Sequence, residues 1–401
     1  MEKDIVILRD LVKKYMDICM NGIQEKRKLW RDHNSLIKTR PLILVGFPPN
    51  EIPECQTSCE DPFFRQYEQH FLNSLYHYKI GDDSIFEPWL TIRAFFSHGG
   101  WGMGARWIRT DVPGGAARFD HPIKDLEDIS KLVTPKHAIN EEETSRRISR
   151  LKDAIGDIID IDVDRGPAYR VWSADISTDL MYLRGLNQMM LDMSDNPEWL
   201  HGLLSFMRDG VLKTHEEAES AGDWSLSSQE NQALTYSHEL PDPKPNSGPV
   251  KRSSLWGFFA AQEFAQVGPE KYYEFLLQYQ IPIMEKFGLV AYGCCEDLTH
   301  KIKYLKKLPN LRRIAVTPWA DIRKCAEQIQ QDYVISWRPN PSDMICCSFD
   351  PDHIRDVVRD AMEATRGCHV DIHLKDTQTY QNEPDRGIKW MKIVREIVEH
   401  Y

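Results

Sequence analysis

The fold is decided by a stretch near the C-terminus that reads His369-Val370-Asp371-Ile372-His373-Leu374-Lys375-Asp376. Polar and apolar residues alternate in it, which is the pattern of a β-strand with two different faces. The polar face carries His369, Asp371, His373 and Lys375. In a barrel of parallel strands wrapped by helices, the apolar face packs on the helices and the polar face looks inward. Ionisable groups in that place cost free energy unless they are paired or bound, so this strand predicts a functional site.

A unit of strand, reactive loop and helix recurs four times towards the C-terminus. The predicted strands are 289–292, 311–316, 333–337 and 369–374, and the predicted helices lie near 298–307, 321–331, 352–364 and 387–400. The loops after the strands carry Cys294, Cys295 and Glu296, then Trp319 and Asp321, then Asn340, then Lys375 and Asp376. Reactive side chains that follow successive parallel strands are what a (β/α)8 barrel provides.

Earlier segments supply the rest of the expected architecture. Residues 90–96, 158–163 and 223–227 are further strand candidates. We therefore expect an α/β fold, a (β/α)8 TIM barrel over residues 89–401, with an N-terminal helical extension over residues 1–88 packing on it. Within the extension, 5–31 has the spacing of one amphipathic helix and 41–47 is a short buried strand. A doubly wound open sheet stays an alternative, although no Rossmann fingerprint supports it.

Two further sequence features are not expected to form binding sites of their own. The glycine-rich stretch His98–Gly104 is not followed by a convincing helix, so we interpret it as a loop lining the site and not as a phosphate cradle. The pairs Cys346–Cys347 and Cys55/Cys59 lack a second metal-like pair and are interpreted as packing.

Composition excludes some classes of function. The chain has 401 residues, of which 41% are hydrophobic and 28% charged, as in an ordinary soluble globular protein. A formal charge of -11 argues against a nucleic-acid or anionic-membrane binder. No apolar run approaches the roughly 18–20 residues that span a bilayer. Nine cysteines without a disulfide framework fit reduced thiols in a cytoplasm.

Several segments resemble one family. The stretches 256–263, 287–296, 309–321, 336–340 and 371–376 look like the uroporphyrinogen-decarboxylase-like superfamily, and the likeness runs from about Trp89 to the C-terminus. The resemblance implies a (β/α)8 barrel. The superfamily contains porphyrin decarboxylases and zinc-dependent methyltransferases that exchange methyl groups with corrinoid proteins, including O-demethylase components. The arginine-containing signature of the decarboxylases is not found here, so the methyltransferase branch is the closer one.

This branch implies a function and a set of partners. The chain is expected to move a methyl group from a small methylated substrate, such as an aryl methyl ether, to a corrinoid. Because no Asp-x-His-x-x-Gly corrinoid-binding pattern occurs in the sequence, the corrinoid is expected on a separate carrier protein. The oligomeric state is left open, a homodimer included.

The resemblance also implies zinc, which takes thiolate, imidazole or carboxylate ligands. Cys294 or Cys295 is the expected thiolate, with His373 and Glu296 as further ligands. Tyr292 stands where the methyltransferases carry the histidine of a His-x-Cys pair, and Cys368 precedes the last strand. The ligand set therefore stays open, and a pair of packed thiols is the alternative.

Other residues are candidates for chemistry and substrate contact. Asp371, Lys375, Asp376 and Glu296 are the expected catalytic groups, with Asp371 and Lys375 as a candidate buried ion pair. The expected substrate contacts are Trp319, Asp321, Trp337, Asn340, Glu263 and Tyr292; the tryptophans could stack on an aromatic ring or simply pack the barrel.

Two other functions remain open. A decarboxylase or lyase would use Lys375 with Arg93, Arg106 and Arg109 to bind carboxylates, and would release CO₂ without a corrinoid. A ligand-binding barrel would do neither, which the polar inward face of the last strand disfavours.

Overall fold

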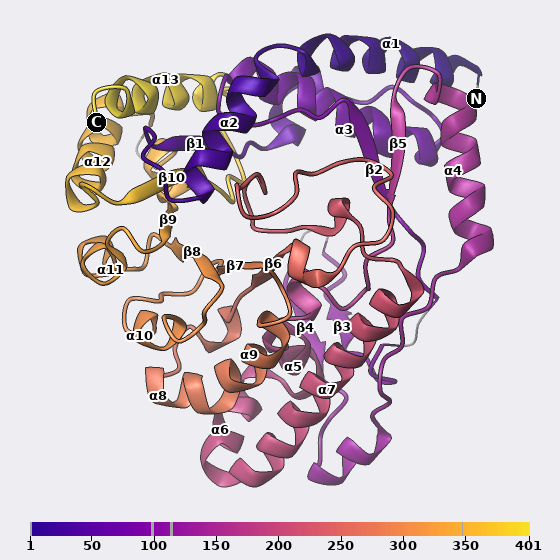
Figure 1. Ribbon diagram of the computed structural model, residues 1–401, viewed down its shortest axis with the longest axis vertical. Helices are drawn as coiled ribbons and strands as arrows, with labels where there is room; N and C mark the ends of the chain where they lie inside the picture. The colour runs from indigo at the N-terminus through magenta and orange to yellow at the C-terminus, as the bar shows by residue number, and fades with distance from the viewer. Residues whose placement is uncertain (1, 98–99, 113–114, 347) are drawn as a thin grey trace.

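The protein has an α/β fold built on parallel strands (Figure 1). The computed structural model describes residues 2–97, 100–112, 115–346 and 348–401, so His98, Gly99 and Cys347 lie outside the described residues. The parallel strands are β1 (Leu42–Val45), β2 (Trp89–Arg93), β5 (Asp160–Asp164), β6 (Trp256–Phe259), β7 (Leu289–Tyr292), β8 (Leu311–Val316), β9 (Val334–Trp337) and β10 (His369–Leu374). Six of them form one sheet in the order β1-β10-β9-β8-β7-β6, while β2 and β5 form a second.

Helices follow the strands and cover the sheets on the outside (Figure 1). They are α1 (Glu2–Cys19), α2 (Ile23–Asn34), α3 (Pro62–Ile80), α4 (Glu141–Ile155), α5 (Ser177–Arg184), α6 (Leu186–Asp195), α7 (Pro197–Ala221), α8 (Pro269–Tyr272), α9 (Gln278–Met284), α10 (Ile302–Leu305), α11 (Ile322–Ile329), α12 (Pro351–Ala364) and α13 (Arg386–Val398). Their starts follow from local chemistry. Asp350, for example, accepts hydrogen bonds from the backbone N–H groups of Asp352 and His353 ahead of α12.

The closed (β/α)8 barrel that we expected is not formed by backbone pairing in the described part of the chain, because the two parallel sheets do not join. The strand expected at 223–227 is wrong. That segment leads into a short 3₁₀ turn, Leu226–Ser228. Its hydroxyls donate to carboxylates of β5, Ser227 to Asp162 and Ser228 to Asp164. Side-chain hydrogen bonds therefore replace the backbone ladder that a strand would have made.

The N-terminal region differs from the expectation in two ways. The single helix predicted for 5–31 is two helices, because the chain turns at Gly22, whose φ of 66° is in the left-handed region that glycine tolerates. The strand predicted at 41–47 is β1, and it pairs in parallel with β10 from Leu42↔Asp371 to Val45↔Leu374. The main sheet thus includes a strand from the 1–88 stretch.

The helix expected at 298–307 is also shorter than predicted. It is reduced to α10, because Asp297 accepts hydrogen bonds from the backbone N–H and the hydroxyl of Thr299 and holds the chain in a turn.

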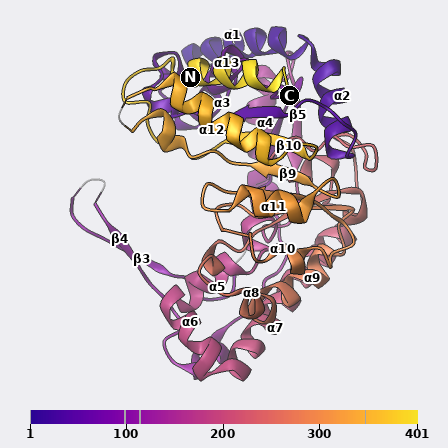
Figure 2. The ribbon, with the colours of Figure 1, turned by 90° about the vertical axis from the view of Figure 1, so that its left-hand side faces the viewer.

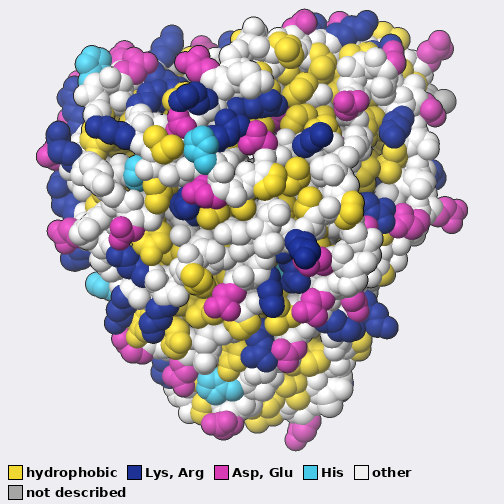
Figure 3. All heavy atoms as spheres, in the orientation of Figure 1, with side chains coloured by type: hydrophobic (Ala, Val, Ile, Leu, Met, Phe, Trp, Pro, Cys, Tyr) yellow, Lys and Arg dark blue, Asp and Glu magenta, His cyan; other side chains and the backbone are white. Residues whose placement is uncertain are grey.

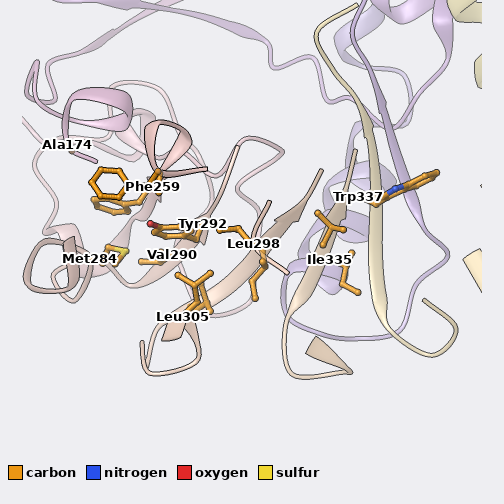
Figure 4. Close-up of a cluster of buried hydrophobic side chains, with 14 of the residues drawn as sticks. Ala174, Phe259, Met284, Val290, Tyr292, Leu298, Leu305, Ile335 and Trp337 are labelled. Atoms are coloured by element: carbon orange, nitrogen blue, oxygen red, sulfur yellow. The ribbon is translucent and has the colours of Figure 1, made fainter. Parts of the chain in front are cut away.

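The strand ends are held in place by a large apolar core. Figure 4 shows Phe259 of β6 and Val290 of β7 near Met284 of α9, while Ile335 of β9 lies further along the same cluster, beside Trp337. Each fully buried side chain of this size contributes roughly 1.5–3 kcal/mol. This core fixes the depth at which β6 to β9 present the loops that follow them.

A hairpin that the sequence did not predict follows the glycine-rich stretch. Strands β3 (Arg106–Arg109) and β4 (Ala117–Asp120) pair antiparallel, with Trp107 opposite Phe119. The hairpin projects away from the body of the protein (Figure 2). Trp107 is 52% exposed although its ring centroid lies 4.1 Å from that of Phe119. An exposed tryptophan on a half-buried phenylalanine is unusual for packing alone on a projecting hairpin.

The surface carries charge of both signs. On the face seen in Figure 3, basic and acidic side chains are interspersed and do not form one large patch. Within the described residues, no helix combines the length and the apolar content required to cross a membrane.

Candidate active site

The centre of the site is the thiol of Cys294, just after β7. The side chain is 3% exposed, whereas its neighbour Cys295 is exposed. Its Sγ lies 3.3 Å from Lys375 Nζ, 3.5 Å from Cys295 Sγ and 3.7 Å from Gln232 Nε2. Lys375 follows β10, so the rule that reactive groups gather at the carboxyl ends of parallel strands holds for this pair.

These neighbours favour a thiolate at Cys294. The hydrogen bond from Cys295 is the main cause, and the charges of Arg338 and Lys375 add to it against the cost of burial, so that the pKa of Cys294 falls to about 6. The pKa of Cys295 is raised, because that thiol keeps its proton to donate a hydrogen bond to Cys294 and because the negative charge of the Cys294 thiolate opposes a second one. Of the two thiols that the sequence left as alternatives, Cys294 is the one that ionises first.

Two residues outside the predicted set complete the cluster. Arg338, buried after β9, donates to the carbonyl of Cys294 and to Gln232 Oε1 at 2.8 Å. Lys375 Nζ donates to the same Oε1 at 3.1 Å. Gln232 therefore aligns both cations beside the thiolate. Its segment has no periodic pattern, so no sequence signal pointed to it, while Arg338 was visible as a charged residue at a strand end.

His373 contributes a neutral imidazole. Burial, with Arg338 and Lys375 close by, lowers the pKa of His373 to about 3. Its Nδ1 is buried and has no hydrogen-bond partner in the described structure. An unpaired buried nitrogen costs free energy that a bound ligand can recover.

Glu296 holds in place the loop after β7 that carries Cys294 and Cys295. It is completely buried, and its carboxylate accepts hydrogen bonds from the backbone N–H groups of Ala261 at 2.6 Å and Cys294 at 2.8 Å. It thus ties the loop after β6 to the loop after β7. Both oxygens are engaged by the protein, which makes Glu296 a positioning residue.

Replacing Glu296 with glutamine should destabilise the protein. The amide retains one acceptor oxygen but sets an NH₂ group against a backbone N–H, so one buried donor loses its partner. We expect a loss of about 1–3 kcal/mol in the free energy of unfolding, measured by urea denaturation. The exposed Glu274→Gln variant is the control, and equal stability of the two variants would contradict the role given to Glu296.

Asp371 lies in a different part of the sheet. It binds Arg313 NH2 at 2.9 Å, His33 Nε2 at 3.1 Å and the hydroxyl of Ser336 at 2.8 Å. The ion pair considered between Asp371 and Lys375 is therefore replaced by one between Asp371 and Arg313. Burial alone would raise the pKa of Asp371, but Arg313, His33 and Ser336 outweigh it and hold that pKa below its usual range.

Within the described structure, the remaining predicted residues form no hydrogen bond with the thiol cluster, although the charge of Asp376 helps to raise the pKa of Cys295. Trp319 is 74% exposed, and Asp376 is exposed with a φ of 57°. Asp321 accepts from the N–H of Lys324 as the cap of α11. Asn340 accepts from the N–H of Ser342 and lines a cleft of about 420 Å³ with the buried Trp337.

The last two predicted contacts lie in buried hydrogen-bond chains. Tyr292 donates to Gln280 Oε1 at 2.6 Å, and Glu263 accepts from the hydroxyls of Ser177 at 2.7 Å and Thr178 at 3.1 Å. Both residues are thus satisfied by the protein itself.

The donor set does not fit the zinc site that was considered. Nowhere in the described residues do three His, Cys, Asp or Glu side chains gather closely enough to hold a metal ion. Glu296 is engaged by two backbone amides, and the thiolate of Cys294 has the ammonium of Lys375 as its counter-charge. We therefore derive no step through a metal. Zinc stays a prediction, which metal analysis of protein purified without chelator, beside Cys294→Ser and Cys295→Ser, would test.

No family model and no curated protein matches the chain. Among solved structures, it is similar to a methyltransferase from Methanosarcina mazei, with a TM-score of 0.50 and 11% sequence identity. The superposition covers 92% of this chain and 97% of the other. At this level of identity the likeness concerns the fold.

Proposed function

We propose that this protein transfers a methyl group from a small methylated compound to a corrinoid carried by a separate protein. The observation that carries the proposal is the contact between the ammonium of Lys375 and the low-pKa thiol of Cys294 at the carboxyl ends of the strands. The fold shared with a methyltransferase is consistent with it. Aryl methyl ethers are the first donors to test.

Methyl transfer of this kind requires the protein to supply a proton donor. When the bond between the methyl carbon and its heteroatom breaks, the electron pair stays on the heteroatom, which then needs a proton. A reduced corrinoid would supply the nucleophile that takes the methyl group. The chain supplies the proton donor and a dry, preorganised surrounding for the charge that develops.

Lys375 is placed to donate that proton. The thiolate of Cys294 and the amide oxygen of Gln232 both accept hydrogen bonds from its ammonium and fix its position. Arg338 adds a second positive charge beside the leaving heteroatom. His373, neutral and with a free Nδ1, can accept a hydrogen bond from the substrate.

The test combines the purified chain with cob(I)alamin, as a stand-in for the carrier protein, and a panel of aryl methyl ethers. Methylcobalamin is followed by absorbance and the demethylated product by mass spectrometry. Lys375→Met should lower the rate by roughly 10²-fold or more, as expected for removal of a general acid. The exposed Lys303→Met variant is the control and should keep its activity.

Other outcomes would point elsewhere. Release of CO₂ from a carboxylated substrate without a corrinoid would contradict methyl transfer and favour the decarboxylase or lyase function. The arginines invoked for that reaction are engaged separately, Arg106 with Asp120 and Arg109 over the ring of Trp107. If Lys375→Met transfers methyl groups as fast as the wild type, the proposed reaction stands, but Lys375 is not its proton donor.

A further inference from the structure

A second pocket lies under the projecting hairpin, away from Cys294. It has a volume of about 280 Å³, and its walls include the aromatic rings of Trp101, Trp107, Phe119, Tyr169 and Tyr182. None of its lining residues belongs to the thiol cluster. A pocket near 300 Å³ is of the size that accepts a small organic molecule.

The rings stand on two sides and at steep angles to one another. On the hairpin side, Trp107 and Phe119 lie 4.1 Å apart at 58°, and Phe119 and Tyr182 lie 4.9 Å apart at 68°. On the other side, Trp101 and Tyr169 lie 5.2 Å apart at 73°. Rings at such angles do not form one flat stack, and all five of them belong to the lining of the pocket.

One carboxyl group stands among these rings. Asp179, in the first turn of α5, is the acidic residue of the lining. Its Oδ2 accepts a hydrogen bond from Trp101 Nε1 at 2.6 Å. Within the described residues, no Lys, Arg or His side chain forms an ion pair with it. The charge of Glu263 also acts on Asp179, whereas burial raises the pKa of Asp175 well above its usual value.

This carboxyl group can ionise, at some cost. Burial raises the pKa of Asp179 to about 6, and the charge of Glu263 adds to the rise while the hydrogen bond from Trp101 opposes it. At neutral pH a partly buried carboxylate is therefore present without a counter-charge. A cation bound in the pocket would supply one.

We propose that this pocket binds a small organic cation with apolar substituents, of the methylated ammonium class. The rings of the lining attract the positive charge through their quadrupoles and pack on the substituents, while Asp179 neutralises it. Trp107 already has the guanidinium of Arg109 over its ring, 5.3 Å from the centroid, so we expect it to contribute mainly packing. A metal ion is a poor fit, because the residues described here do not gather three metal-binding side chains anywhere. A neutral aromatic ligand would use the rings but not the carboxylate. The inference rests on the pocket alone and stands whether or not the chain transfers methyl groups.

Direct binding to the full-length protein tests the proposal. The probes are choline and dimethylbutanol, in which carbon replaces the ammonium nitrogen and removes the charge at constant shape. Binding is followed by isothermal titration calorimetry and by tryptophan fluorescence. We expect choline to bind at least about tenfold more tightly than dimethylbutanol, because only the cation gains from Asp179 and the ring faces.

Variants separate the two contributions. Asp179→Asn keeps an acceptor for Trp101 Nε1 and should reduce the preference for the charged probe to the part that the rings contribute, whereas the exposed Asp10→Asn should retain the full preference. Trp107→Leu should weaken choline binding about two- to fivefold. Circular dichroism checks that each variant is folded. Equal affinity for the two probes, a preference unchanged in Asp179→Asn, or no choline binding at millimolar concentrations would each overturn the proposal.

Discussion

Alkylation of Cys294 by iodoacetamide should reach half of its maximal rate near pH 6. The pKa of this thiol falls to about 6 because Cys295 donates a hydrogen bond to it and because Arg338 and Lys375 place positive charge nearby, against the opposing effect of burial. The thiolate is the reactive form. Near pH 6 an ordinary thiol is almost wholly protonated, so Cys294 should carry roughly 10²-fold more thiolate than such a thiol. The rate is followed by mass spectrometry of the peptide that contains residue 294.

The neighbours of the thiol give the controls. Cys295→Ala removes the hydrogen bond that contributes most to the lowered pKa of Cys294, and it leaves a single thiol in the peptide. The pH profile of alkylation in this variant should therefore move to higher pH. Lys375→Met should move it in the same direction, because the counter-charge is lost. Lys303→Met changes an exposed lysine and should leave the profile in place. A wild-type profile centred where ordinary thiols titrate would show that the cluster does not stabilise a thiolate, and the role of Lys375 would have to be given up.

Part of this arrangement could be predicted from the sequence, because parallel strands have a direction. Strands 289–292, 311–316 and 369–374 have the predicted bounds. Groups just beyond the carboxyl ends of parallel strands meet at one edge of a sheet. That rule placed Cys294 and Lys375 at the same end of the sheet, although the sequence analysis interpreted Cys294 as a metal ligand and paired Lys375 with Asp371.

The alternating pattern of β10 predicts on which face of the sheet each side chain lies. It does not predict how far along the strand, inside the sheet or at its rim, that side chain acts. Asp371 and Lys375 share a face, yet four residues of a strand span about 13 Å. Asp371 therefore reaches Arg313 and His33, and Lys375 reaches the thiol at the strand ends. A period of two cannot distinguish a residue inside the sheet from one at its rim.

Other parts of the site left no usable signal. Asp321 and Asn340 were selected because polar residues follow strands, but the same residue types cap the starts of helical turns, and that is what they do here. Gln232 lies in irregular chain, where neither period nor propensity indicates which side chain points inward. The missing closure of the barrel has a similar origin, since Ser227 and Ser228 satisfy carboxylates on β5 by side-chain contacts that no strand pattern encodes.

The polar network around Asp371 should be the most costly place to remove a charge. Replacing Arg313 with methionine is expected to lower the free energy of unfolding by about 3–5 kcal/mol at neutral pH, because it leaves a fully buried carboxylate without its cation. The guanidinium also donates to Asn34 Oδ1 at 2.9 Å, so the change loosens α2 from the sheet as well. Urea and thermal denaturation measure the loss. Arg355→Met, at the exposed pair with Asp352, is the matched control and should change little.

The pH dependence separates a lost ion pair from lost packing. The pKa of Asp371 in the folded protein lies below its usual value near 3.8, so its contribution is present above that value and is lost as the pH falls through the lower folded value. In Arg313→Met the carboxyl is buried without its cation, so its folded pKa should rise and protonation should then stabilise the folded state. The gap in stability between the two proteins should therefore narrow in acid. If the difference in stability between the wild type and Arg313→Met stays constant with pH, Arg313 acts through packing. The double variant, Arg313→Met with Asp371→Leu, would then recover no stability. If the ion pair is the cause, the double variant should recover part of the loss, because two apolar groups leave no buried charge uncompensated.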